Sequence, residues 1–335
     1  MWHHDCMKDH SINSVAARAG VSIATVSRVL NNSKPVSAPT RERVLESVQA
    51  LGFRANVFGR SLRKAESRLI LVLVPDFSNP YYAEIVQGID LVMRERGYNI
   101  LLAGVSDNWT QDTSTLNLLN NKLADGVISL AHIEADAGIM GALKNTPWVA
   151  CSEAPSIQDI PFVSIDHRQA AMDAVQYLLN QGHQRIALIS ADETYQWASL
   201  RHQGYVQVLQ RAGMEIDPEL IRVANKVEYA QGVRAAASLL SLPNPPTAVF
   251  AVADTLAIGA IKTFKKAGKR VPQDIAVIGF DNVPIAEVFE PSLTTIGQPM
   301  RELGGAAAQT LLALLEGKKP ASQTLAHSLI LRNSA

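Results

Sequence analysis

Short apolar runs alternate with longer amphipathic stretches from residue 69 onward. Continuous apolar runs of four to six residues are typical of strands that are buried on both faces, as in parallel sheets covered by helices. We predict strands over 69–74, 99–104, 126–130, 148–151, 162–166, 185–190, 247–252 and 275–280. The alternation therefore indicates an α/β fold for this part of the chain.

These elements are too many for one compact sheet. We therefore predict two doubly wound parallel sheets that form two lobes with a cleft between them. In such folds, ligands bind where the carboxyl ends of the strands face the cleft. The second part of the chain is thus expected to bind a small molecule between its lobes.

Hydrophobic residues make up 47% of the 335-residue chain, but no apolar run approaches the ~20 residues that span a bilayer. The first ten residues lack the basic and apolar regions of a signal peptide. Cys6 and Cys151 lie far apart without metal-ligand spacing, which fits a reducing compartment. We expect a cytoplasmic, nucleoid-associated protein without a membrane partner.

The chain has no net charge, but its charges are unevenly divided. Residues 1–66 carry ten basic and five acidic side chains. The remaining residues therefore carry five more acidic than basic side chains. A basic head on an acidic body indicates that the head binds a polyanion such as nucleic acid. The alternative is a solvated basic face without a partner.

Residues 12–32 predict two short helices joined by a glycine turn, the helix-turn-helix arrangement. Gly20 suits the positive φ that ends a helix, and Ser22 can cap the next one. A third helix follows, with Ser37 as its N-cap and Gly52 at its end. An ordinary helical hairpin with an exposed arginine is the alternative.

In the second helix, Val26, Val29 and Leu30 are expected to face the core. The outward side chains fit a major groove, because arginine can read guanine, short apolar groups can contact thymine methyls, and hydroxyls can bind phosphates. The predicted DNA contacts of this region are Ser22, Ile23, Ala24, Thr25, Ser27, Arg28 and Asn31.

The segment "SVAARAGVSIATVSRVLNNSKPVSAPTRERVLESVQALGFRAN" contains the patterns VAxxAGVSxATVSRVLN and VSxxTRxRV. It closely resembles the DNA-binding head of the LacI/GalR family of bacterial repressors. The resemblance implies a dimer that binds a near-palindromic operator, with a body similar to periplasmic sugar-binding proteins. It also implies the cAMP receptor protein as a partner at shared promoters.

The resemblance divides the chain into four parts. These are a flexible segment (1–10), a helix-turn-helix domain (11–55), a hinge (56–68) and an effector-binding and dimerisation domain (69–335). Lobe 1 is expected at about 69–166 and 297–322, and lobe 2 at about 167–294 and 325–335. The expected crossings between the lobes follow Asp166, lie near 291–299, and lie around 322–325.

Several sequence segments of the body, such as "VIGFDNVPIAEVFEPSLTTIGQP", resemble those of cytidine-responsive members of the family. A nucleoside such as cytidine is therefore the expected effector, and a purine or a sugar is the alternative. The ring of Tyr81 or Tyr82 can stack on a base or a sugar face. The alternative is packing at a helix N-terminus, which we expect for at least one of the two. The expected effector-binding residues are Asn79, Tyr81, Tyr82, Asp166, Trp197, Arg201, Asp254, Asp281 and Gln298.

We also consider an enzyme and a transport receptor. The sequence has no P-loop, no G-x-G-x-x-G at a strand–helix turn, no G-x-S-x-G and no metal-binding His/Cys spacing. We therefore expect no catalytic residue, metal or cofactor. The basic head and the lack of a signal peptide argue against a transport receptor.

The stretch "NVFGRSLRK" matches the family's hinge helix, which becomes ordered on DNA. By resemblance, Leu62 inserts into the minor groove and Arg60 faces a phosphate. Ala55 and Gly59 depart from the proline and the alanine that relatives often carry. A glycine inside a helix weakens it, so we expect a hinge that folds only weakly.

Replacing Gly59 by alanine should raise operator affinity and narrow the range of half-site spacings that the protein accepts. Glycine costs about 1 kcal/mol relative to alanine in a helix, hence roughly 2 kcal/mol for two hinges in a dimer. Binding of both proteins to operators of different half-site spacing measures both effects. No change in either quantity would contradict the hinge role.

Overall fold

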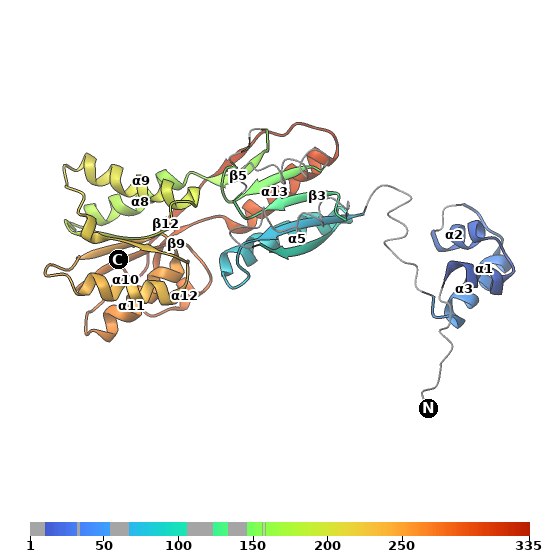
Figure 1. The fold of residues 1–335 in the computed structure, drawn as a ribbon, viewed down its shortest axis with the longest axis horizontal. Helices are drawn as coiled ribbons and strands as arrows, with labels where there is room; N and C mark the ends of the chain where they lie inside the picture. The colour runs from blue at the N-terminus through green and yellow to red at the C-terminus, as the bar shows by residue number, and fades with distance from the viewer. Residues whose placement is uncertain are drawn as a thin grey trace, which may run out of the picture. The chain divides into compact units, whose positions relative to one another are not determined.

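The computed structural model describes residues 11–31, 34–53, 67–105, 123–132, 146–155, 157 and 159–335. The chain divides into two compact units, Met1–Ser67 and Arg68–Ala335 (Figure 1). The predicted flexible segment 1–10 and hinge residues 56–66 lie outside the described residues. No described helix is long and apolar enough to cross a membrane.

The first unit contains the three helices predicted from the sequence. They are α1 (Ile12–Ala19), α2 (Ile23–Asn31) and α3 (Ala38–Ala50). Gly20 ends α1 with φ 64°, and the Ser22 hydroxyl accepts a hydrogen bond from the Thr25 amide at 3.2 Å. Ser37 precedes α3, but its hydroxyl bonds to Thr40 Oγ1 and caps no backbone amide.

One small core holds these helices together. Val15, Val26 and Val44, one from each helix, are completely buried. Leu30 and Val48 pack against this core from its edge. The core therefore fixes which face of α2 points outward.

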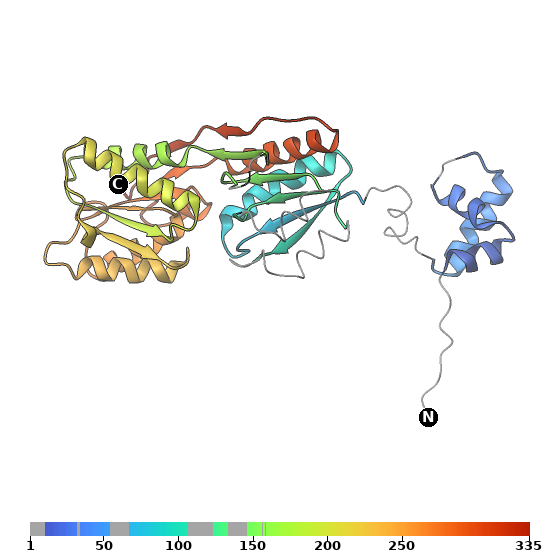
Figure 2. The same cartoon turned by 45° about the horizontal axis from the view of Figure 1, so that its top comes forward.

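The second unit contains two six-stranded sheets, one in each lobe (Figure 2). The first sheet has the order β11-β5-β4-β3-β1-β2 and is entirely parallel. Its strands are β1 (Leu69–Val74), β2 (Asn99–Gly104), β3 (Gly126–Ser129), β4 (Trp148–Cys151), β5 (Phe162–Ile165) and β11 (Gln323–Leu325).

The second sheet has the order β12-β10-β9-β8-β6-β7, and only β12 runs antiparallel to its neighbour. Its strands are β6 (Ile186–Ala191), β7 (Ile221–Ala224), β8 (Ala248–Ala251), β9 (Ala276–Asp281), β10 (Thr294–Gly297) and β12 (Ser328–Ile330). The predicted fold class of two doubly wound sheets is confirmed.

Helices pack in pairs on both sheets (Figure 1). In lobe 1, α5 packs against α13, which also contacts β3, β4 and β5; in lobe 2, α8 packs with α9 and α10 with α11. The helices are α5 (Pro80–Glu95), α8 (His167–Asn180), α9 (Gln196–Arg211), η2 (Pro218–Leu220), α10 (Tyr229–Leu240), α11 (Asp254–Lys266), α12 (Ile285–Val288) and α13 (Met300–Leu315).

The chain passes between the lobes three times. It crosses between β5 and α8 at Asp166, and between β10 and α13 at Gln298–Pro299. The third crossing lies between β11 and β12 at 326–327, because β11 still pairs with β5 of the first sheet. The sequence placed this crossing too early, at 322–325. One hydrophobic cluster extends through both lobes.

Close contact between α5 and α13 gives a stability prediction. A Cβ on Gly304 would lie 2.0 Å from the Ile85 carbonyl oxygen, whereas a Cβ on Gly305 would have ordinary contacts with Val92 Cγ2 at 3.7 Å and the Gly88 carbonyl oxygen at 4.0 Å. Gly304→Ala should therefore destabilise the protein by about 1–3 kcal/mol through overpacking. Urea unfolding measures the change.

Gly305→Ala is the matched control in the same helix. It should leave stability unchanged or raise it by up to about 1 kcal/mol, because alanine favours helix. Equal effects of the two substitutions would contradict close packing at Gly304.

Candidate functional site

The outward face of α2 carries the side chains that were predicted to contact DNA. Ser22, Ile23, Ala24 and Arg28 are exposed, and Thr25 and Ser27 are half-buried. The buried Val26 and Val29 occupy the opposite face. The side chain of Asn31, together with Arg60 and Leu62, lies outside the described residues.

A second set of polar side chains lies where the two lobes meet. Gln298, at the crossing between the lobes, donates from Nε2 to Asp281 Oδ1 at 2.7 Å and accepts from the Tyr81 hydroxyl at 3.2 Å. The Tyr81 hydroxyl also lies 2.8 Å from Ser152 Oγ. Tyr81 and Ser152 belong to lobe 1 and Asp281 to lobe 2, so these bonds join the lobes.

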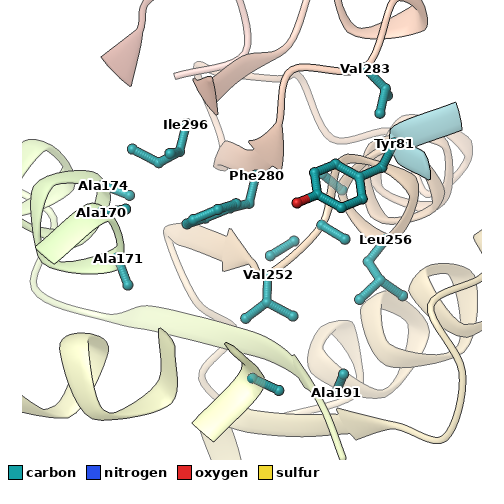
Figure 3. Packing of buried hydrophobic residues seen from close by; sticks show 14 of the residues in the cluster. Tyr81, Ala170, Ala171, Ala174, Ala191, Val252, Leu256, Phe280, Val283 and Ile296 are labelled. Carbon is teal, nitrogen blue, oxygen red and sulfur yellow. The ribbon is translucent and has the colours of Figure 1, made fainter. Parts of the chain in front are cut away.

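Apolar contacts surround this network. Tyr81 belongs to the same buried cluster as Phe280, Val252 and Val283 of lobe 2 (Figure 3). Figure 3 shows the Tyr81 ring, from α5, with its hydroxyl directed toward Phe280. Polar groups buried in this surface between the lobes need specific partners.

Arg201 of α9 is the central charge of the site and is only 4% exposed. Its guanidinium lies 3.5 Å from the Phe280 ring centroid and 4.7 Å from that of Trp197. One Nη donates to the Val252 carbonyl oxygen, and the same nitrogen lies 3.7 Å from Asp281 Oδ1. Nε has no hydrogen-bond partner, so one donor remains open.

His167 supports the guanidinium from the start of α8. Its Nε2–H donates to the Ser152 carbonyl oxygen at 2.8 Å, and its Nδ1 accepts from Arg201 Nη2 at 3.2 Å. The bond that Nδ1 accepts requires the neutral imidazole. Burial and then the Arg201 charge lower the pKa of His167 to about 3.

Asp281 is the carboxylate nearest to Arg201. Burial raises the pKa of Asp281 to about 6, although Arg201 and the hydrogen bond from Gln298 oppose the shift. Asp281 has φ 115° and Ser152 has φ 89°, backbone conformations that non-glycine residues rarely adopt. Such strain at the ends of β9 and β4 is typical of functional sites.

The other predicted effector-binding residues lie around this centre. Asn79 caps α5 by accepting from the Tyr81 amide, and Asp166 caps α8 by accepting from the Gln169 amide. Tyr82 is half-buried and meets Tyr81 edge-on at 5.2 Å. Trp197 stacks on Tyr195 at 5.8 Å.

Asp254, another predicted effector-binding residue, is hydrogen-bonded within lobe 2. Its oxygens accept from the Val283 amide at 2.9 Å and from Thr295 Oγ1 at 2.5 Å, and the residue is fully buried. Burial and then the Asp281 charge raise the pKa of Asp254 well above its usual value. Protein donors contact both oxygens, and the effector contact of Asp254 stays a prediction.

The sequence prediction missed four side chains of this region. Ser152 and Glu153 follow β4, His167 follows the crossing after β5, and Ser190 lies near the end of β6. Ser190 Oγ and Glu153 Oε2 are buried without a hydrogen-bond partner. The rule that selected Asp281, a polar residue at a strand end, applies equally to Ser152 and Glu153.

Comparison with known proteins identifies the family. A model of bacterial regulatory proteins of the lacI family matches residues 11–56, and a periplasmic binding protein-like domain matches residues 175–335. The chain is 38% identical over 327 residues to the HTH-type transcriptional repressor CytR of Escherichia coli strain K12, covering 97% of this chain and 96% of that protein. The chain belongs to the LacI family.

Solved structures of two transcriptional regulators share the fold. The lac repressor dimer bound to operator and the anti-inducer ONPF has a TM-score of 0.84 at 27% identity, covering 97% of this chain and 98% of that one. The regulator CelR in complex with cellobiose has a TM-score of 0.74 at 32% identity, covering 97% and 99%. This LacI-family chain is a DNA-binding transcriptional repressor.

Substitution of His167 should change how stability depends on pH. The unfolded chain protonates a histidine below about pH 6.5. The folded protein protonates His167 only near pH 3, so this residue lowers stability as the pH falls from 6.5 toward 3. The loss approaches about 1.4 kcal/mol per pH unit.

A glutamine at this position cannot titrate, so His167→Gln should lose less stability than the wild type between pH 6.5 and 4.5. Urea unfolding of both proteins across this range measures the difference. Parallel stability curves would show that the folded protein does not exclude the proton.

Proposed function

We propose that this repressor changes its affinity for a near-palindromic operator when a nucleoside, such as cytidine, binds between its lobes. The observation that supports the proposal is the group of polar side chains from both lobes. Tyr81 and Ser152 face Arg201 and Asp281 across the crossing residue Gln298. A purine or a sugar is the alternative effector.

The chemistry of these groups suits a nucleoside. The Asp281 carboxylate is an acceptor for adjacent ribose hydroxyls, and the open Nε–H of Arg201 is a donor for a carbonyl oxygen. Tyr81, Tyr82 and Trp197 supply aromatic surfaces for a base. An effector that binds one lobe closure more tightly than another shifts the equilibrium by that difference in affinity.

Exposed apolar side chains support the homodimer. In lobe 1, Leu91 of α5 is 65% exposed, and Leu101 and Leu102 lie on the edge strand β2. In lobe 2, Val288 of α12 is 75% exposed. A second copy would cover such surfaces, and a dimer would place two α2 helices on two half-sites.

The cAMP receptor protein remains a predicted partner.

The described residues give little support to the alternative of an enzyme. His167 uses both ring nitrogens in hydrogen bonds, and its pKa is lowered to about 3 by burial, so it is a poor base. Burial raises the pKa of the Cys151 thiol to about 12, which keeps it from acting as a nucleophile.

Titration of the full chain with cytidine, by calorimetry and by operator binding, tests the proposal. Cytidine should bind and change operator affinity. Asp281→Asn should weaken cytidine binding by about tenfold or more, because hydrogen bonds to charged groups contribute roughly 1.5–3 kcal/mol. Without cytidine, the variant should still bind operator.

Asp274→Asn is the control, because Asp274 precedes β9 and forms an exposed pair with Arg270 at the opposite end of that strand. It should leave cytidine affinity unchanged. Conversion of cytidine into a product would contradict the sensor role, and equal operator affinity with and without cytidine would contradict the choice of effector.

A further inference from the structure

Glu153 is a buried acidic side chain to which the proposed function assigns no contact with the effector. It follows the strained Ser152 at the end of β4 and is 6% exposed. Oε1 lies 3.6 Å from His132 Nδ1, which is longer than a hydrogen bond, and Oε2 has no hydrogen-bond partner. A buried acceptor without a donor is costly, so this position is suited to a ligand that brings one.

Glu153 directly follows Ser152, whose Oγ lies 2.8 Å from the Tyr81 hydroxyl in the network that joins the lobes. After burial, the Glu153 charge is the largest cause that raises the pKa of Tyr82. The same charge acts on Arg201 of the other lobe. Glu153 Oε2 and Arg201 Nε are therefore an open acceptor and an open donor on opposite lobes.

We propose that Glu153 is a specificity-determining residue that accepts a hydrogen bond from an N–H donor of the effector, and so selects an amino-substituted base. This inference rests on the nucleoside effector proposed above. Cytosine carries an amino group at the ring position where uracil carries a carbonyl oxygen. A carboxylate accepts from the amino group and repels the carbonyl oxygen, so it discriminates between the two bases.

Calorimetric titration of the full chain with cytidine and with uridine tests the inference. The wild type should bind cytidine at least about tenfold more tightly than uridine, because a mismatched base leaves a buried polar group unpaired. Glu153→Gln should reduce this ratio to within about threefold, since an amide can also donate to a carbonyl oxygen.

A gain in uridine affinity distinguishes specificity from a structural role, because a merely destabilised variant would lose affinity for both nucleosides. Glu153→Asp retains the carboxylate and should keep the preference for cytidine. Glu219→Gln is the matched control and should keep the wild-type ratio, because Glu219 is exposed in η2, before β7 of the second sheet.

The outcomes separate the two proposals. Cytidine binding with the same cytidine-to-uridine ratio in the wild type and Glu153→Gln would overturn the role of Glu153 and leave the nucleoside effector intact. Equal affinity of the wild type for cytidine and uridine would also overturn the role of Glu153 and leave the nucleoside effector intact. This outcome does not depend on whether the variant folds. Failure of every nucleoside to bind would overturn both.

Discussion

The buried guanidinium of Arg201 is the constraint around which the body is organised. Removing a charge from water costs several kcal/mol unless protein groups replace the contacts that the charge had with water. Phe280 offers its ring face, Val252 a carbonyl oxygen, His167 a neutral nitrogen and Asp281 a carboxylate. These groups come from β9, the end of β8 and the start of α8, so the charge determines how three parts of lobe 2 converge.

Gln298 extends this arrangement to the other lobe. One end of its amide bonds to Asp281 and the other to Tyr81, and Tyr81 in turn contacts Ser152. The two lobes are thus joined directly by hydrogen bonds through Gln298. Among the described residues, Arg201 Nε, Ser190 Oγ and Glu153 Oε2 are buried polar atoms without a partner. An effector would meet open groups there and would have to compete for the others.

The extent to which sequence predicted this structure depended on the polarity of each element. Eight strands were predicted to within one residue at each end because apolar residues predominate in each. β10 was missed because its buried Thr294 and Thr295 look polar, although their hydroxyls are hydrogen-bonded inside the protein. β11 and β12 have three residues each, too few for a periodic signal.

The same distinction applies to the site. Tyr81, Arg201, Asp281 and Gln298 were chosen from strand ends and family resemblance, and the structure brings them together. Asp254 satisfied the same pattern, but the donors that occupy it come from residues far along the chain, which sequence does not reveal. The open oxygen of Glu153 is likewise a property of the packed fold.

The placement of β1 has a mechanical consequence. This strand begins beside Arg68, where the second unit starts, and ends six residues later, shortly before the helix that carries Tyr81. At about 3.3 Å per residue it is a rod about 20 Å long. Its neighbours β2 and β3 brace it along both edges. Because the sheet holds β1 on both edges, β1 moves with lobe 1 as one body, and Arg68 at its amino end moves with it.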